Sequence, residues 1–301
     1  MWAALAVVYV VWGSTYLFIL LASRTLPVFV MSSLRFLVAG GLLYAWSVRR
    51  GDRVGDRPGR KQWVAAGIVG AALFLVGNAG VAWAEKRVDT GVASLVIAAV
   101  PLWMALFDRV ACGQRLNRTA VTGLGLGFGG VTLLAWPSGP SHIDIEGAIA
   151  LLVAGSAWAA GSLYSRRAPL PRRPLVSAGM QMLSGGAMLA VVAAATGEWT
   201  SIHHVSATSI LALVYLIVIG SWLAFTAYAW LLRATRTSLV STYAYVNPLV
   251  AVFLGWAVEN ESVSVRTLGA GAVILVAVAL IVTPPKGERA TEPTPVPVRG
   301  R

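Results

Sequence analysis

The stretch WAALAVVYVVWGSTYLFILLA, residues 2–22, contains no charged residue and is long enough to cross a bilayer as one helix. A hydrocarbon core of about 30 Å needs roughly 20 apolar residues at the helical rise. Nine similar stretches follow, so the sequence predicts an all-α integral membrane protein with ten transmembrane helices. The ten stretches cover residues 2–22, 28–48, 63–84, 90–108, 120–136, 146–165, 175–196, 207–232, 239–259 and 267–283.

The composition supports a membrane protein and excludes an ordinary soluble one. The chain is 57% hydrophobic and 12% charged, whereas a soluble domain carries roughly 25% charged residues. The ten stretches leave no segment that could fold as a soluble domain. The Pro-rich residues 284–301 lack apolar side chains, so we expect them to form a disordered cytoplasmic tail. A single cysteine excludes an internal disulfide.

The net charge of +12 would suggest nucleic acid as the partner of a soluble protein. When the loops are assigned alternately to two sides, 19 of the 24 Lys and Arg residues fall on one side and four on the other. Arg35 alone lies within a span. Basic loops mark the cytoplasmic side, so both termini are predicted to be cytoplasmic, and no nucleic-acid partner is expected. The basic side holds residues 49–61, 109–118, 166–173, 233–236 and 286–301.

The second half of the chain repeats the first at an offset of about 147 residues. Trp83 aligns with Trp230, and Pro101 aligns with Pro248. The predicted repeats, residues 1–138 and 139–283, hold five helices each. Because five is odd, the two repeats must cross the membrane in opposite orientations. Inverted repeats are typical of secondary transporters, which bind their substrate near mid-membrane between the repeats.

Several short motifs resemble the EamA family of the drug/metabolite transporter superfamily. They are WGSTY at 12–16, LRF at 34–36, GN at 77–78, AE at 84–85, VP at 100–101 and YAYVNPLVAVFLG at 243–255. The resemblance implies a ten-helix carrier made of two EamA repeats, and exporters of amino acids and related metabolites are its best-known members. The family ends its fourth and ninth helices with Gly-Glu, where this chain has Gly113-Gln114 and Asn260-Glu261.

Aromatic side chains near mid-membrane are the first candidates for substrate contact. An interfacial belt explains tryptophans at span ends, but it does not explain Trp12, Trp158 and Trp222, which lie near span centres. Trp12 and Trp158 are repeat-related, so we expect them to face one another across a central cavity. Such walls suit an amphipathic solute, although helix packing is the alternative. Residues that share a helix face with an aromatic or amide candidate join the set, namely Tyr16, Ser162, Tyr243 and Asn247.

Polar groups inside hydrocarbon are costly and are therefore functional candidates. The amides of Asn78 and Asn247 can bond either a solute or a neighbouring helix. Arg35 can hold a substrate carboxylate, or it can snorkel or pair near a helix end. Glu85 is the best titratable candidate, with a gate ion pair or simple solvation as alternatives. Together, Arg35 and Glu85 are predicted to be gating or structural charges.

Two prolines and several glycines complete the pattern. Pro101 and Pro248 are predicted to be hinges for alternating access, with a static kink as the alternative. Small residues allow helices to approach closely within one chain or across a dimer, so we expect a monomer or a weak homodimer. These small residues are Gly123, Gly125, Gly127, Gly129, Gly40-Gly41 and Gly185-Gly186.

The sequence thus predicts a secondary transporter of small amphipathic metabolites, an exporter in a bacterial inner membrane, with no metal or other cofactor. A flippase for lipids or lipid-linked sugars is the first alternative. A polytopic membrane enzyme is the second. Such an enzyme would need paired carboxylates, a cluster of histidines or a nucleophile with its base, and no span contains two acidic residues.

Overall fold

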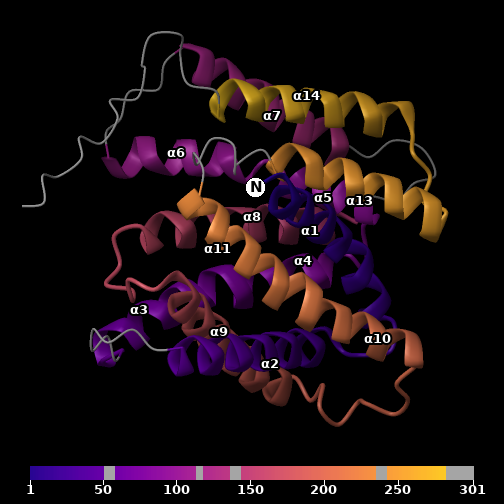
Figure 1. The fold of residues 1–301 in the computed structure, drawn as a ribbon. Coiled ribbons are helices and arrows are strands. Elements are labelled where there is room, and N and C mark those ends of the chain that lie inside the picture. The colour runs from indigo at the N-terminus through magenta and orange to yellow at the C-terminus, as the bar shows by residue number, and fades with distance from the viewer. Residues whose placement is uncertain (51–57, 113–117, 136–143, 235–242, 283–301) are drawn as a thin grey trace, which may run out of the picture.

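The computed structural model describes residues 1–50, 58–112, 118–135, 144–234 and 243–282, and this part of the chain contains helices and no strands. The predicted tail, residues 284–301, and Gly113-Gln114 lie outside the described residues. Figure 1 shows the helices running roughly parallel or antiparallel in one bundle. They are α1 Trp2–Ser23, α2 Val28–Arg49, α3 Arg60–Gly70, η1 Ala71–Asn78, α4 Ala79–Ala84, α5 Thr90–Ile97, α6 Val100–Cys112, α7 Arg118–Ala135, α8 Ile145–Ser165, α9 Pro174–Ala195, α10 Ala207–Tyr215, η2 Leu216–Leu223, α11 Ala224–Ala234, α13 Tyr243–Glu259 and α14 Val265–Val282.

Seven helical stretches in the described part of the chain are long and apolar enough to cross a membrane. They correspond to predicted spans one to four and six to eight. Three further apolar helices are shorter, at Val121–Leu133, Val246–Glu259 and Val265–Leu280, and they coincide with predicted spans five, nine and ten. The all-helical membrane architecture is confirmed, and the number of ten crossings stays a prediction.

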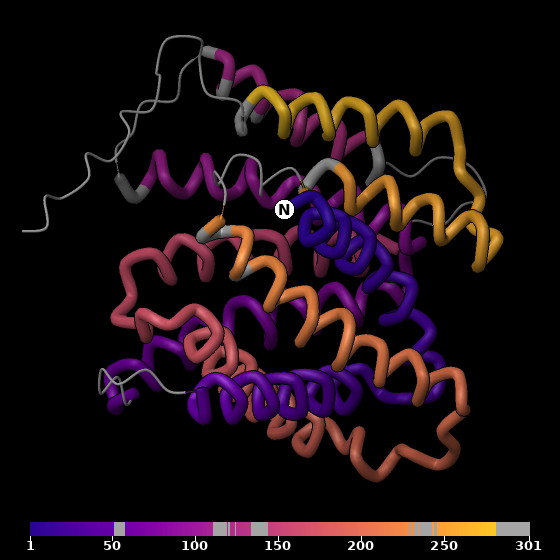
Figure 2. Tube along the Cα trace, in the orientation of Figure 1, coloured from indigo at the N-terminus to yellow at the C-terminus, as the bar shows by residue number. Residues whose placement is uncertain are grey.

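Packing joins helices that are far apart in the sequence. α2 lies along α9, and α7 lies along α14; Figure 2 shows these two pairs at opposite edges of the bundle. Between them, α1 packs against α13 and against α10 and α11, while α8 packs against η1, α4 and α6. Each half of the chain therefore completes its packing with helices of the other half.

Two of the spans contain a π-helical segment, η1 in the third span and η2 in the eighth. A π-turn takes in an extra residue, which shifts the following side chains around the helix axis, and such turns often lie at functional sites. η1 ends at Asn78, and η2 contains Ser221 and Trp222. These segments place polar side chains near the middle of the bundle.

The two predicted hinges differ in the structure. Pro101 lies at the start of α6, directly after the helix is interrupted at Ala98 and Ala99. There, Ala99 N–H donates to the Val96 carbonyl, three residues back. Pro248 instead lies inside α13, which continues past it. Whether either proline moves during transport stays a prediction.

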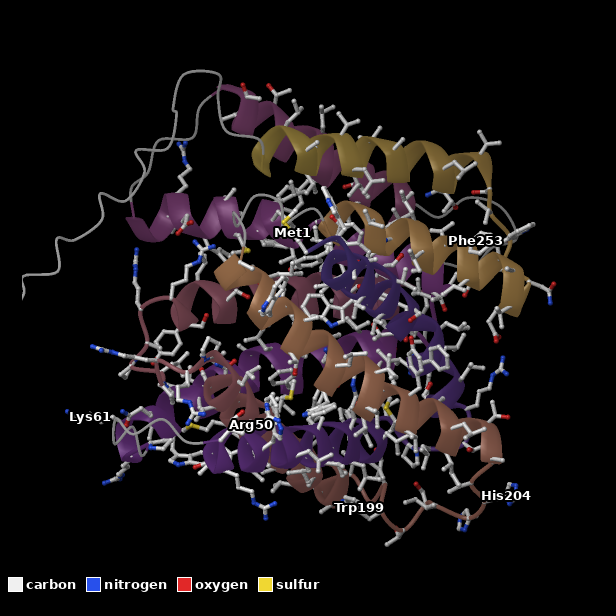
Figure 3. The ribbon with its side chains drawn as sticks, viewed as in Figure 1. Met1, Arg50, Lys61, Trp199, His204 and Phe253 are labelled. Carbon is white, nitrogen blue, oxygen red and sulfur yellow. The ribbon has the colours of Figure 1, made fainter. Side chains whose placement is uncertain are left out.

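The surface of the bundle carries large apolar side chains, as expected of a surface covered by lipid. Phe253 and Trp256 on α13 are 59% and 56% exposed, and Figure 3 shows Phe253 at the rim of the molecule. Lys61 and His204 lie at opposite ends of the helices in the same view. Large apolar side chains are thus exposed on the sides of the bundle, while the exposed polar residues Lys61 and His204 lie at its ends.

Glycine contacts explain how tightly the helices approach. A Cβ atom at Gly70 would lie 2.5 Å from the Gln181 carbonyl oxygen, whereas one at Gly125 would meet no atom within 4 Å. Gly40 and Gly186 are similarly tight, against Met182 and Leu37. These glycines serve packing within one chain.

We predict that Gly70→Ala lowers the free energy of unfolding by about 1–3 kcal/mol, because backbone atoms of α9 must move to admit the methyl group. Gly125→Ala is the matched control and should be neutral or slightly stabilising in a helix. Thermal unfolding of the purified variants in detergent measures the difference. Equal unfolding midpoints for the two variants would contradict the packing described here.

Candidate functional site

Arg35 is the centre of a buried polar cluster. Its side chain is 5% exposed; Nε donates to Ser221 Oγ at 3.0 Å, and a terminal nitrogen donates to Asn78 Oδ1 at 3.3 Å. The partners belong to η2 and η1, so both π-segments converge on this guanidinium. We call Arg35, Asn78 and Ser221 the central polar cluster. Both hydrogen-bond partners are neutral, and the guanidinium also lies over the ring of Phe36, with its carbon 4.9 Å from the ring centroid.

The first helix closes this cluster from another side. A Cβ atom at Gly220 would lie 3.1 Å from Thr15 Cγ2 and 3.7 Å from a terminal nitrogen of Arg35. Next to it, Ser14 and Tyr215 share a hydrogen bond of 2.8 Å. α1, α2, η1 and η2 therefore meet around Arg35.

Trp12 lies in an aromatic cluster built from three helices. Its indole is 5.4 Å from the ring of Phe225, 5.1 Å from that of Tyr228 and 5.1 Å from that of Tyr243, measured between centroids. Tyr16, one turn further along α1, is half-buried against an aliphatic cluster. The predicted pair of Trp12 and Tyr243 is thus brought into contact, while Tyr16 faces a different group of residues.

Trp158 and its helix neighbour Ser162 are half-buried on α8. A Cβ atom at Gly77 would lie 3.1 Å from Trp158 Cε3, so the indole packs against η1 beside Asn78. The aromatic rings around Trp12 belong to α11 and α13, whereas Trp158 contacts η1. Trp12 and Trp158 thus have separate surroundings, and whether both contact a solute stays a prediction.

Trp222 is half-buried next to Ser221, and its ring lies 6.1 Å from that of Trp46, edge to face. Its indole N–H has no hydrogen-bond partner among the described residues. A buried donor left unpaired costs free energy. This donor is therefore available to a ligand.

The side chain of Asn247 forms hydrogen bonds with neighbouring backbone groups of α1 and α13. With its amide nitrogen facing the two carbonyl oxygens, the side chain donates to Tyr9 and Tyr243 at 3.1 Å each. This turn of α13 also packs closely on α1, since a Cβ atom at Gly13 would lie 2.6 Å from Val250 Cβ and 3.0 Å from the Asn247 carbonyl oxygen. In this state Asn247 links α1 to α13.

Acidic side chains cap two helices at the end of the bundle where α1 ends and α2 begins. Glu261 accepts from Thr90 N–H at 2.7 Å and from Gly91 N–H at 3.1 Å, at the start of α5. Glu198 accepts from Phe29 N–H at 2.8 Å and from Val30 N–H at 3.1 Å, at the start of α2. Carboxylates are favoured at helix N-termini, where N–H groups are unpaired.

An ion pair adds to these caps, since Arg24 after α1 binds Glu259 at the end of α13. We call Glu198, Glu259 and Glu261, with their partners, the carboxylate latch. In each contact, an acidic residue of the second half of the chain holds an element of the first half. The latch ties the two halves together at one end.

Glu85 lies close to the latch but does not join it. Its side chain is 3% exposed, and neither carboxylate oxygen has a hydrogen-bond partner among the described residues. Burial raises the pKa of Glu85 well above its usual value; the negative charge of Glu261 raises that pKa further, and the positive charge of Arg35 lowers it. Glu85 is the buried acid of this region.

Sequence reasoning missed three of these functional groups: Ser221, Glu198 and Glu261. Ser221 carries no signal of its own, because its role depends on the π-turn of η2. For Glu261, the signal was indirect: α5 begins after Asp89, whose side chain forms no cap, and its N–H groups needed an acceptor from elsewhere.

An apolar groove of about 430 Å³ lies between α13 and α14. The described residues that line it are aliphatic or aromatic apart from Thr267 and include Leu249, Phe253 and Trp256. It offers no set of polar groups that would orient a solute. We therefore place the candidate site at the central polar cluster.

Comparisons with known proteins identify the family of the chain. The model of the EamA-like transporter family matches residues 1–136 and again 145–283. The inner membrane transporter YedA of Escherichia coli, which has no characterised activity, is 35% identical over 93% of this chain and 90% of that protein. The chloroplastic WAT1-related protein At3g02690 of Arabidopsis thaliana is 25% identical over 93% of this chain and 69% of that protein.

A crystal structure of a 24% identical protein superimposes with a TM-score of 0.63, covering 92% of this chain and 94% of the other. At this identity, the likeness supports the fold. The family model and the YedA relative reach nearly the whole described chain. The chain belongs to the EamA-like transporter family and is a membrane transporter, not an enzyme.

Proposed function

We propose that this transporter is a secondary carrier that exports small amphipathic metabolites, such as amino acids, by alternating access. The observation that carries the proposal is the central polar cluster: a buried guanidinium with neutral partners, next to aromatic side chains. Such a guanidinium has N–H donors beyond the two that bond Ser221 and Asn78. These can bind a carboxylate, while Trp12 and Trp222 suit the apolar part of a solute.

The packing pattern supports two inverted repeats, residues 1–138 and 139–283. In the repeat, α1 corresponds to α8, and η1 with α4 corresponds to η2 with α11. α1 packs on η2 and α11, and α8 packs on η1 and α4, which is the exchange expected of a pseudo-two-fold axis. The paired π-segments support the same correspondence. An axis in the membrane plane would place the site between the repeats.

The distribution of charge supports cytoplasmic termini in a bacterial inner membrane. The described residues Arg49, Lys61, Arg109 and Arg166 flank helices at one end, and the carboxylate latch occupies the other. The basic end is then cytoplasmic, and the latch closes the outer side. Opening the carrier outward requires the latch to release.

A flippase for lipids or lipid-linked sugars is the second candidate, favoured by the apolar groove between α13 and α14. Binding screens separate the two functions. A ligand that binds the folded protein raises its unfolding temperature by mass action. We expect amino acids or aromatic metabolites with a free carboxylate to raise it, and stabilisation by lipid-linked sugars alone would favour the flippase.

The two mid-membrane tryptophans give a direct test of the site. Trp12→Ala and Trp158→Ala should each weaken the binding of such a solute by about tenfold or more, about 1.4 kcal/mol, because each removes an apolar wall of the site. Trp2→Ala is the matched control, since Trp2 lies on the same helix as Trp12 and is 70% exposed. Titrations of solute against the purified variants measure this, and unchanged affinity in both variants would remove the tryptophans from the site.

A further inference from the structure

The buried carboxyl group of Glu85 has no role in the site described above. Glu85 directly follows the last residue of α4 and is 3% exposed. Neither of its carboxyl oxygens has a hydrogen-bond partner among the described residues. An ionised carboxylate without partners is very costly away from water, so a buried acid of this kind takes up a proton instead. The geometry therefore favours a protonated Glu85 in this state.

Among the described residues, no charged neighbour forms a hydrogen bond with the Glu85 carboxyl group. Arg35 on α2 acts on Glu85 electrostatically, but its guanidinium donates hydrogen bonds to Ser221 and Asn78. Tyr16 on α1 is another titratable neighbour, and the carboxylate of Glu261 adds a negative charge. Arg87, two residues along the chain, pairs with acids at the start of α8, with 3.2 Å between its Nε and Asp144 Oδ2.

Glu85 is also linked to the latch that would close the outer side. Glu261, whose charge acts on Glu85, is the residue that caps α5. When the latch opens, water reaches the end of α4, and a hydrated carboxyl group returns toward the ordinary Glu pKa of about 4.3. It then releases its proton to the outside at neutral pH. When the latch closes, burial favours uptake of a proton.

We propose that Glu85 is a proton-binding site that couples this carrier to proton movement, holding a proton while the carboxylate latch is closed and releasing it when the latch opens. The proposal rests on the alternating-access function above. Because the closed state binds the proton more tightly than the open state, external protons favour closure by linkage. Each turn of the cycle can then move a proton as well as a solute.

Labelling with dicyclohexylcarbodiimide tests the proton site without any transported solute. This reagent modifies protonated carboxyl groups in apolar surroundings, and mass spectrometry of the full chain in liposomes locates the modified residue. We expect Glu85 to be modified at neutral pH and modification to fall as the pH rises. Glu198, an ionised helix cap, is the internal control and should stay unmodified. Absence of modification of Glu85 at neutral pH would overturn the proposal.

A variant that opens the latch without changing any charge tests whether the latch controls the protonation of Glu85. A Cβ atom at Gly255 would overlap Glu261 Oε2, so Gly255→Ala displaces the Glu261 carboxylate. Modification of Glu85 at neutral pH should then fall by about threefold or more, because hydration restores the ionised form. Unchanged modification in a Gly255→Ala variant that folds would show that the latch does not control the proton.

Glu85→Gln mimics the protonated form, so it should leave the unfolding temperature at neutral pH unchanged. In proteoliposomes, this variant should exchange a transported solute across the membrane but lose accumulation driven by a pH gradient. Glu146→Gln, at an exposed acid on the same end, should keep both activities. A loss of stability in Glu85→Gln, or gradient-driven accumulation equal to wild type, contradicts the proposal. Because the labelling needs no solute, its failure is distinct from failure of the carrier function.

Discussion

Replacing Arg35 with Gln is expected to abolish transport while the protein still folds in the membrane. Truncating one partner of a buried, hydrogen-bonded charge pair costs about 2–5 kcal/mol, which corresponds to a loss of roughly 30-fold to several thousandfold in solute affinity. The loss arises because a glutamine amide is neutral and cannot offer a carboxylate two parallel, charge-assisted N–H bonds. Uptake into proteoliposomes, normalised to folded protein, measures it.

Two further variants separate recognition from structure. Arg35→Lys keeps the charge, but an ammonium group cannot replace the planar fork that bonds Ser221 and Asn78 together, so most activity should still be lost. Arg50→Gln is the control, because Arg50 is exposed at the end of the same helix, where it stacks on Trp46. If Arg35→Gln lowers only the amount of folded protein and leaves the solute KM unchanged, Arg35 is structural.

Replacing Glu261 with Gln is expected to open the end of the bundle that holds the carboxylate latch, which is the outer end in the proposed orientation. The substitution keeps an oxygen acceptor but removes the negative charge that caps α5. Charged caps at helix N-termini contribute about 0.5–2 kcal/mol, so the open population should rise roughly twofold to 30-fold. A cysteine at position 90, introduced after replacing the single natural cysteine, Cys112, reports opening by its rate of reaction with an impermeant thiol reagent.

Thr90 is a suitable reporter position because it is 1% exposed in the latched state. Glu146→Gln provides the control, since Glu146 lies at the same end of the bundle, 3.9 Å from Arg87, and takes no part in the latch. Both variants lose one acidic charge. Equal reaction rates at position 90 in the Glu261 and Glu146 variants would show that Glu261 does not hold the outer end closed.

The sequence was sufficient to predict the all-helical membrane fold and the transporter family. Both follow from hydrophobic length and local motifs, which are properties of single segments. Arg35 and Asn78 could be identified for the same reason, since a polar residue within an apolar span is visible without its neighbours. Their mutual hydrogen bond was not predictable, because it depends on how α2 and η1 face each other.

Other features depend on geometry that the sequence does not encode locally. The π-segments η1 and η2 shift side chains by an extra residue per turn, so helix-face arguments based on regular spacing fail beyond them. The Glu198 cap on α2 joins residues about 170 positions apart, and no short motif marks it. For Trp12, spacing indicated a mid-membrane aromatic residue, but only the fold shows that Phe225 and Tyr228 surround it.

Solute counterflow in proteoliposomes tests both the proposed carrier function and the role of Arg35 in it. Purified wild-type protein and Arg35→Gln are reconstituted side by side and tested against labelled amino acids and aromatic metabolites. We expect counterflow of at least one carboxylate-bearing solute by the wild type and none by Arg35→Gln. The proposed function would be contradicted if folded, inserted wild-type protein showed no counterflow for any solute. Equal counterflow by the two proteins would contradict the role of Arg35.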